Sequence, residues 1–210
     1  MTRIYLVRHG QSVSNLEHMI AGTLDVKLTS LGEQQAQQTA EYLKDVPFTH
    51  IYSSPLDRAY NTALPHLAYH DVPITRIDAL REMDLGTWEG QKYFELRGKD
   101  VQFDLFVTEF GTSVPPGGES AMGAGARVRE AVIALAQKHP DESILIVSHA
   151  AVLRVVIGMT LGIEPSAYGE KLPFPTNASV QIMDFDGGDL TLVEFSHDEH
   201  ITNKTAVTTC

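Results

Sequence analysis

The stretch that decides the fold is Arg3-Ile4-Tyr5-Leu6-Val7-Arg8-His9-Gly10, near the start of the chain. Ile4 to Val7 form a short apolar run rich in β-strand formers, which predicts a buried strand. The run stops at the polar pair Arg8 and His9. Gly10 then allows the backbone to turn sharply and a ligand to approach closely. A buried strand with this ending predicts a functional loop directly after it.

A second strand far along the chain has the same ending. Ser143-Ile144-Leu145-Ile146-Val147 is the clearest buried strand in the sequence, and Ser148-His149 follow it. In open α/β sheets, ligands bind outside the carboxyl ends of the strands. If the two strands run parallel as neighbours, the imidazoles of His9 and His149 meet at one edge. We expect the functional site at that edge.

The rest of the chain alternates between expected strands and helices, which indicates an α/β three-layer sandwich with a largely parallel central sheet flanked by helices. The expected helices begin near Ser30, with Thr29 or Ser30 as cap, and near Leu56, and cover 119–138 and 150–162. Further strands are expected at 50–53 and 74–80. A hairpin of 180–185 and 190–195 adds an antiparallel edge strand.

Residues 91–117 are irregular and rich in aromatic side chains, so we expect a small cap or lid there. We expect one domain over 1–196 that carries this cap. The segment 197–210 is predicted to be a polar and loose C-terminal tail. The sequence does not decide whether the cap aromatics form a core or contact a substrate.

Charge and composition limit the partners. The chain has 210 residues and a formal net charge of -11, which disfavours binding to nucleic acid or to an anionic membrane. Its single cysteine, Cys210, cannot form an internal disulfide. We see no leader peptide and no apolar run of the roughly 20 residues that a membrane span requires. We therefore expect a cytoplasmic protein without nucleic-acid or membrane partners; the sequence leaves a homodimer open.

Five motifs follow one another along residues 3–195. They are Arg8-His9-Gly10-Gln11-Ser12-Val13-Ser14-Asn15, Ser53-Ser54-Pro55-Leu56-Asp57-Arg58-Ala59, the acidic segment from Arg81 to Gly90, Pro116-Gly117-Gly118-Glu119-Ser120, and Val147-Ser148-His149-Ala150. In this order they resemble the motifs of the histidine phosphatase superfamily, also called the phosphoglycerate mutase-like family. Arg-His-Gly alone is a weak match, but the ordered set makes coincidence very improbable.

The resemblance implies a metal-independent phosphatase, without a cofactor, that acts on a small phosphorylated metabolite. It implies His9 as the nucleophile, Arg8, Arg58 and His149 as groups that bind the phosphate, and Glu82 as the general acid. These residue types suit the chemistry, because a phosphoryl group in transfer carries negative charge that cationic and hydrogen-bonding groups stabilise. The second nitrogen of His9 should donate a hydrogen bond, plausibly to a backbone carbonyl, to fix the tautomer.

Further contacts are expected around the phosphate. Asn15 supplies a neutral donor, and the backbone amides from Ala150 onward add positive partial charge at a helix start. The family lines its substrate pocket near Ala21, Gly22 and Thr23. Gln11 and Ser12 complete the expected binding set, although many relatives carry an acidic residue and threonine there, a mild change.

Three alternatives stay open. A phosphoglycerate mutase primed by a bisphosphate is disfavoured, because the insertion before the long helix is short and aromatic where the mutase branch has a longer, basic one. A non-catalytic module that binds a phospholigand is disfavoured by the complete set of catalytic residue types. A metal-dependent hydrolase is weakest: His66 and His70 have ligand-like spacing, but no third ligand is evident and Pro65 disturbs their helix.

Overall fold

The computed structural model describes residues 1–204; Cys210 and the rest of 205–210 lie outside the described residues. No helix of the described part is long and apolar enough to cross a membrane. The elements, in chain order, are β1 (Thr2–Arg8), α1 (Val13–Glu17), α2 (Ser30–Tyr42), β2 (Phe48–Ser53), α3 (Asp57–Ala63), the 3₁₀ turn η1 (Leu64–Ala68), β3 (Ile74–Arg76), η2 (Asp78–Leu80), η3 (Gly86–Trp88), α4 (Tyr93–Leu96), α5 (Val101–Thr108), α6 (Ala121–Lys138), β4 (Ser143–Ser148), α7 (Ala150–Thr160), η4 (Pro165–Ala167), α8 (Tyr168–Lys171), β5 (Val180–Phe185) and β6 (Leu190–His197).

The six strands form one sheet in the order β3-β2-β4-β1-β5-β6. β1, β2, β3 and β4 run parallel to one another. On the other side of β1, β5 pairs antiparallel with β1, and β6 pairs antiparallel with β5. β1 and β4 pair in register, with Val7 opposite Val147 and Arg8 opposite Ser148. Both strands are buried on two faces, which explains their continuous apolar sequences. The largely parallel sheet with an antiparallel edge is therefore confirmed.

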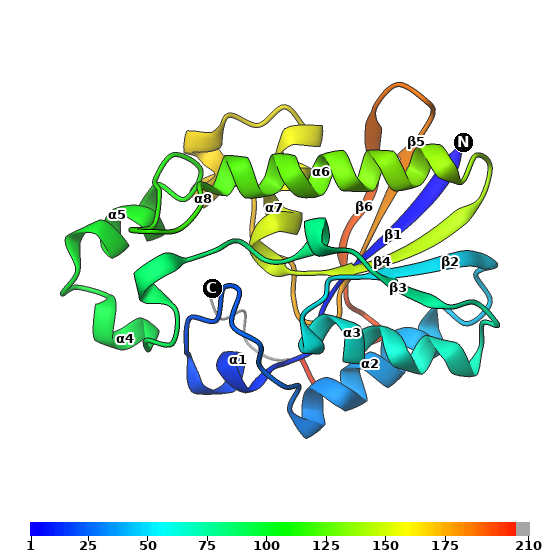
Figure 1. The fold of residues 1–210 in the computed structure, drawn as a ribbon, viewed down its shortest axis with the longest axis horizontal. Helices are drawn as coiled ribbons and strands as arrows, with labels where there is room; N and C mark the ends of the chain where they lie inside the picture. Colours follow the sequence, from blue (N-terminus) through cyan, green and yellow to red (C-terminus); the bar gives the residue numbers. More distant parts are fainter. Residues whose placement is uncertain (205–210) are drawn as a thin grey trace.

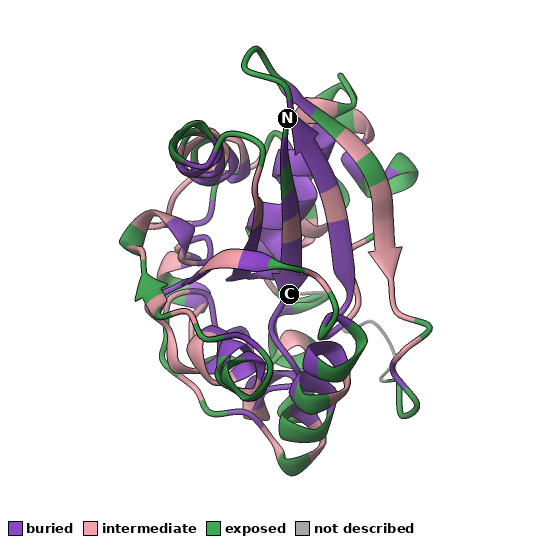
Figure 2. Cartoon of the chain, turned by 90° about the vertical axis from the view of Figure 1, so that its right-hand side faces the viewer, coloured by how far each residue is buried: buried purple, intermediate pink, exposed green. Residues whose placement is uncertain are grey.

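Helices cover both faces of this sheet, so the three-layer arrangement is confirmed as well. Figure 1 shows α6 and α7 on one side and α2 and α3 on the other. Alternate strand residues supply the two cores: Leu6 and Ile146 belong to the cluster that includes residues of α6 and α7, and Val7 and Val147 to the cluster that includes residues of α3. The central strands are buried while β6 at the edge is mostly half-exposed or exposed (Figure 2).

The segment predicted to be an irregular cap contains two short helices, α4 and α5, which lie beyond the strand ends in Figure 1. Aromatic rings hold it together: Trp88 meets Phe103 and Phe106 at centroid distances of 5.2 and 5.3 Å. The indole of Trp88 also donates to Asp100 at 3.1 Å, which satisfies its buried N–H group. The division into a domain with a cap and a tail stays a prediction.

Local signals explain several helix boundaries. Thr29, not Ser30, caps α2, and its hydroxyl accepts from the amide of Gly32 at 3.0 Å. Pro65 ends α3 early, as expected, and the chain continues as the 3₁₀ turn η1. His66 and His70, the disfavoured metal pair, lie 6.1 Å apart by ring centroid and pack near Phe48.

The expectation of a loose tail is wrong for residues 197–204. The ring of His200 stacks on Tyr42 of α2 at 4.6 Å, and Ile201 is buried. The side chain of Gln35 donates to the carbonyl of Asn203 at 3.2 Å. The sequence signal failed because a few well-placed contacts to α2 order a segment that is polar on average.

The contact between α6 and α7 depends on Gly125. A Cβ atom built there would lie 2.1 Å from Cγ1 of Val155, which is buried in α7. Gly→Ala in a helix usually stabilises by about 0.5–1 kcal/mol. We expect Gly125→Ala to destabilise the protein instead, by about 1–3 kcal/mol, because the helices must separate. Urea unfolding measures the change.

The matched control is Gly123→Ala on the exposed side of the same helix, where the added Cβ meets only the Ser120 hydroxyl. This variant should change the free energy of unfolding much less. If Gly125→Ala is as stable as the control, the tight approach of α6 and α7 is not a constraint on this fold.

Candidate active site

The in-register pairing of β1 and β4 brings His9 and His149 together. Each histidine follows its strand by one residue, and the amide of His9 extends the ladder by donating to the carbonyl of Ser148 at 3.0 Å. The two ring centroids are 5.2 Å apart, with a tilt of 59°. One tetrahedral phosphate can bridge such a separation. The expected meeting of the two imidazoles at one sheet edge is therefore present.

The tautomer of His9 follows from its hydrogen bond. Its Nδ1 lies 2.7 Å from the carbonyl oxygen of its neighbour Gly10. A carbonyl can only accept, so Nδ1 carries the proton and Nε2 presents its lone pair. Burial, together with the nearby cations Arg58 and Arg8, lowers the pKa of His9 well below its ordinary value. His9 is therefore a neutral imidazole at physiological pH, as a nucleophile must be.

His149 is fully buried behind His9 and does not itself line the cavity. Its Nε2 is 2.7 Å from the hydroxyl of Ser54, which follows β2. Its Nδ1 is buried and has no hydrogen-bond partner among the described residues. Burial, Arg58 and His9 lower the pKa of His149, so this ring is also neutral. An unsatisfied buried nitrogen next to a nucleophile indicates a place for a ligand atom.

Two buried guanidiniums complete the site. Arg8 is the last residue of β1 and Arg58 lies in the first turn of α3; both line the cavity. Arg58 donates to the carbonyls of Gly22 and Leu24, each at 2.7 Å. Burial lowers the pKa of Arg58 to about 10, which still leaves it charged at neutral pH. The site is therefore locally cationic in an acidic protein.

Glu82 is the one carboxylate among the described residues that line the cavity. It accepts hydrogen bonds from the amides of Met83, Ala151 and Val152 at 2.9 to 3.2 Å. The sequence assigned the amides at the start of α7 to phosphate, but in this structure two of them hold Glu82.

Asp84 and Glu89, two other carboxylates of the acidic motif, have other partners. Asp84 accepts from the amide of Gly86 at 2.8 Å, and Glu89 accepts from the amide of Thr23 at 2.7 Å. Neither of them lines the cavity. The arrangement therefore favours Glu82 over both as the proton donor.

The predicted binding residues divide into two groups. Asn15, Ala21, Gly22 and Ala150 line the cavity. The Oδ1 atom of Asn15 accepts from the backbone and hydroxyl of Ser12 and from Asn177, which leaves its amide NH₂ group as the donor for a ligand.

Gln11, Ser12 and Thr23 do not line the cavity. The side-chain oxygen of Gln11 accepts from Thr29 at 2.7 Å, and Ser12 caps α1. Thr23 is held by Glu89. The side chains of these three residues hold the loops around the cavity and do not line the cavity itself.

The sequence reasoning missed several contributors. Asn177 donates to the carbonyl of His9 at 3.1 Å, and Ser54 fixes the ring of His149. Arg127 of α6 holds the segment before Glu82 by donating to the carbonyls of Ala79 and Arg81. No spacing signal connects Asn177 to His9, because their contact crosses the whole chain.

The comparisons with known proteins agree with this geometry. The family model "Histidine phosphatase superfamily (branch 1)" matches residues 4–198. The adenosylcobalamin/alpha-ribazole phosphatase of Escherichia coli is 30% identical over 79% of this chain and 82% of its own length. A probable phosphoglycerate mutase, GpmB, of Salmonella choleraesuis is 33% identical over 88% of this chain and 86% of its own.

A solved structure gives the same result for the fold. A mutant of phosphoserine phosphatase from Entamoeba histolytica, in complex with phosphoserine, superposes with a TM-score of 0.84. It is 31% identical and covers 96% of this chain and 100% of its own. Together with a family match over nearly the whole length, this shows that the chain belongs to the histidine phosphatase superfamily, branch 1.

Proposed function

We propose that this chain is a phosphomonoesterase that hydrolyses small phosphorylated metabolites through a phosphohistidine on His9. The observation that carries the proposal is the pair of neutral imidazoles at adjacent strand ends, 5.2 Å apart, beside the cations Arg8 and Arg58. Phosphatases among the relatives support it. We retain the prediction of a cytoplasmic location.

In the first step, Nε2 of His9 attacks phosphorus and the bond from phosphorus to the leaving oxygen breaks. Glu82 gives its proton to that oxygen, so the alcohol leaves neutral. Arg8 and Arg58 stabilise the negative charge on the equatorial oxygens. Asn15 donates to the same group through its amide. We assign the buried Nδ1 of His149 as a further donor, with the Ser54 hydroxyl donating to Nε2 in that tautomer.

In the second step, Glu82, now a carboxylate, accepts a proton from water. The water oxygen bonds to phosphorus as the bond to Nε2 of His9 breaks, which releases inorganic phosphate and restores both residues. To serve as an acid, Glu82 must loosen its hold on the amides of Ala151 and Val152. Those amides, at the start of α7, can then face the phosphate as the sequence predicted.

The leaving group is expected to be uncharged and partly apolar. Beyond the phosphate groups and Glu82, the described lining is mostly apolar, and its cations are Arg8 and Arg58 alone; the other lining residues are Leu85, Phe106, Phe110, Ala21, Ala150, Ala151, Gly22 and Ser14. With both guanidiniums engaged by phosphate, a second anionic group would face an apolar wall and the carboxylate of Glu82. Phe106 and Phe110 thus act both as cap core and as cavity wall.

This lining also separates the leading proposal from a phosphoglycerate mutase. A mutase must hold the carboxylate of its substrate, and the described lining offers no third cation for it. If the mutase reading is right, turnover of 3-phosphoglycerate should require added 2,3-bisphosphoglycerate. A module that only binds phosphate would leave no acid-labile label on His9.

Replacement of His9 by alanine removes the nucleophile. We expect His9→Ala to lower phosphate release from p-nitrophenyl phosphate at least about a thousandfold and to abolish acid-labile phosphate labelling. EDTA should leave wild-type turnover within about twofold, since no step uses a metal. His197→Ala, a histidine of β6 outside the cavity, is the control and should keep its activity. Equal labelling of His9→Ala and wild type would reject His9 as nucleophile.

The lowered pKa of His9 predicts an unusual pH profile. An ordinary histidine with a pKa of about 6.5 is roughly 10% neutral at pH 5.5, so kcat/KM would fall about eightfold from pH 7. The pKa of His9 lies well below that value, because burial and two cations disfavour its protonation. We expect kcat/KM at pH 5.5 to stay within about twofold of its value at pH 7. A fall centred near pH 6.5, with the fold intact by circular dichroism, would contradict the neutral nucleophile.

A matched pair of substrates tests the cavity. Glycerol 3-phosphate and 3-phosphoglycerate have similar size, but only the latter carries a carboxylate. We expect kcat/KM to be at least about tenfold higher for glycerol 3-phosphate, because burying an unpaired charge is costly. Leu85→Lys adds a cation to the lining and should reduce the difference in kcat/KM between the two substrates. Equal rates for both substrates in the wild type would show that the apolar lining does not select the leaving group.

A further inference from the structure

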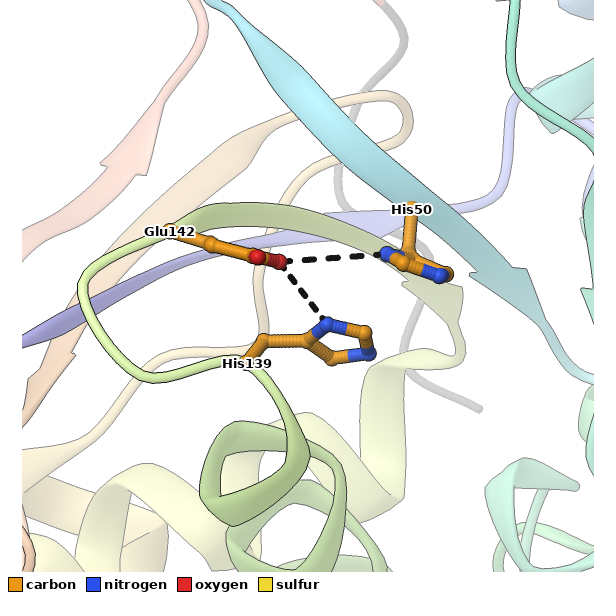
Figure 3. Close-up of side chains that lie close together, drawn as sticks. All are labelled: His50, His139 and Glu142. Carbon is orange, nitrogen blue, oxygen red and sulfur yellow. Dashed lines mark hydrogen bonds and ion pairs between the residues drawn. The ribbon is translucent and has the colours of Figure 1, made fainter.

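A second polar cluster lies at the opposite end of the sheet from the cavity. His50 of β2, His139 at the end of α6 and Glu142 just before β4 turn toward one another (Figure 3). One ligand atom of each residue lies within 4.8 Å of those of the other two. Along β4 this cluster is about five residues, or roughly 17 Å, from the end that carries His149.

We propose that His50, His139 and Glu142 bind a divalent transition-metal ion of the zinc type. Two imidazoles and one carboxylate are a set of ligands that zinc uses when water fills its fourth position. Calcium and magnesium prefer all-oxygen surroundings, so the two imidazoles select against them. The site is separate from the phosphatase machinery and links β2, α6 and β4.

The distances suit a metal of this size. Ligand atoms around a tetrahedral zinc are about 3.4 Å apart, given bonds of about 2.0–2.1 Å. Nδ1 of His139 lies 2.9 Å from Oε2 of Glu142, and Nδ1 of His50 lies 4.0 Å from the same oxygen. These values lie on either side of the required spacing, so small side-chain rotations complete the geometry.

The outer contacts orient the ligands. Nε2 of His139 is 2.7 Å from the hydroxyl of Tyr52, which can accept a hydrogen bond from Nε2–H; in that tautomer the Nδ1 lone pair is free to bind the metal. The hydroxyl of Thr49 donates to Oε2 of Glu142 at 2.6 Å. A register shift in the pairing of β2 with β4, between Phe48 and His50, lies at the cluster. Such irregularities often aim a side chain at a functional site.

The cluster is also accessible from solvent. The side chains of His50 and Glu142 are 43% and 38% exposed, so a metal ion and its water can reach them.

A hydrogen-bonded pair alone does not account for this arrangement. The contact of His139 with Glu142 is complete without His50, yet the two imidazole rings lie only 3.9 Å apart. Apart from the distant Glu142 oxygen, the polar partner of the His50 ring among the described residues is the Thr49 hydroxyl, at a long 3.3 Å. Two basic rings so close together on one carboxylate are what a shared cation would require.

The test uses the untagged full-length protein, stripped with EDTA and dialysed into phosphate-free buffer. Calorimetric titration with zinc chloride should show one site per chain with a micromolar or lower Kd, and zinc should raise Tm by several degrees. Cobalt(II) should give the intense visible absorption of a four-coordinate site. Phosphatase activity should not change, since the cluster lies far from the cavity.

Two variants and one control locate the site. His50→Ala should abolish the cobalt spectrum, and Glu142→Gln, which keeps the side-chain shape, should weaken zinc binding at least about tenfold. His197→Ala, a histidine outside the cluster, should bind zinc as the wild type does. The proposal is overturned if the wild type binds no stoichiometric zinc, or if His50→Ala retains it. If zinc inhibits turnover and the His50→Ala variant is inhibited in the same way, the inhibitory zinc ion binds in the cavity and not in the cluster.

Discussion

The parallel, in-register pairing of β1 with β4 is the constraint on which the site depends. Val7 lies opposite Val147, so the residues that follow the two strands meet without any other adjustment. A slip of one residue would turn every side chain of one strand to the other face of the sheet, and both cores resist that. Apolar packing on both faces thus places the backbone of the two histidines, and the hydrogen bonds to Gly10 and Ser54 then orient the rings.

Two buried guanidiniums, those of Arg8 and Arg58, lie at this edge of the sheet in a protein of net charge -11. For Arg58, the solution is to satisfy the guanidinium with the backbone carbonyls of Gly22 and Leu24. A carbonyl meets the need for hydrogen bonds but does not neutralise the cation, as a carboxylate would. The charge therefore stays available for a phosphate. The same cations help to keep His9 unprotonated, so in the proposed mechanism one arrangement serves both to bind the phosphate and to activate the nucleophile.

The sequence predicted what depends on strand ends and failed where contacts cross the chain. His9, His149, Arg8 and Arg58 were found because strand termination and motif order mark them. The binding roles of Gln11 and Ser12 stay predictions: the side-chain oxygen of Gln11 accepts from the Thr29 hydroxyl, and Ser12 caps α1. Among possible metal ligands, the sequence offered only His66 and His70, because their spacing is that of two ligands on one helix. His139 and Glu142 lie three residues apart between α6 and β4, but His50 belongs to β2, and no linear spacing links it to them.

The cap shows why the phosphate site and the specificity of the enzyme can change independently. Phe106 packs on Trp88 on one side and on Phe110 on the other, and Phe110 meets Phe174 at 5.4 Å. This row of rings is anchored in the core, yet two of its members form the cavity wall. None of the strand-end residues lies in the row. A substitution in the cap therefore alters the surroundings of the leaving group while the register of β1 and β4 keeps the phosphate groups in place. Because the cap and the strand ends are separate in this way, related proteins can be named for different substrates and still belong to one family.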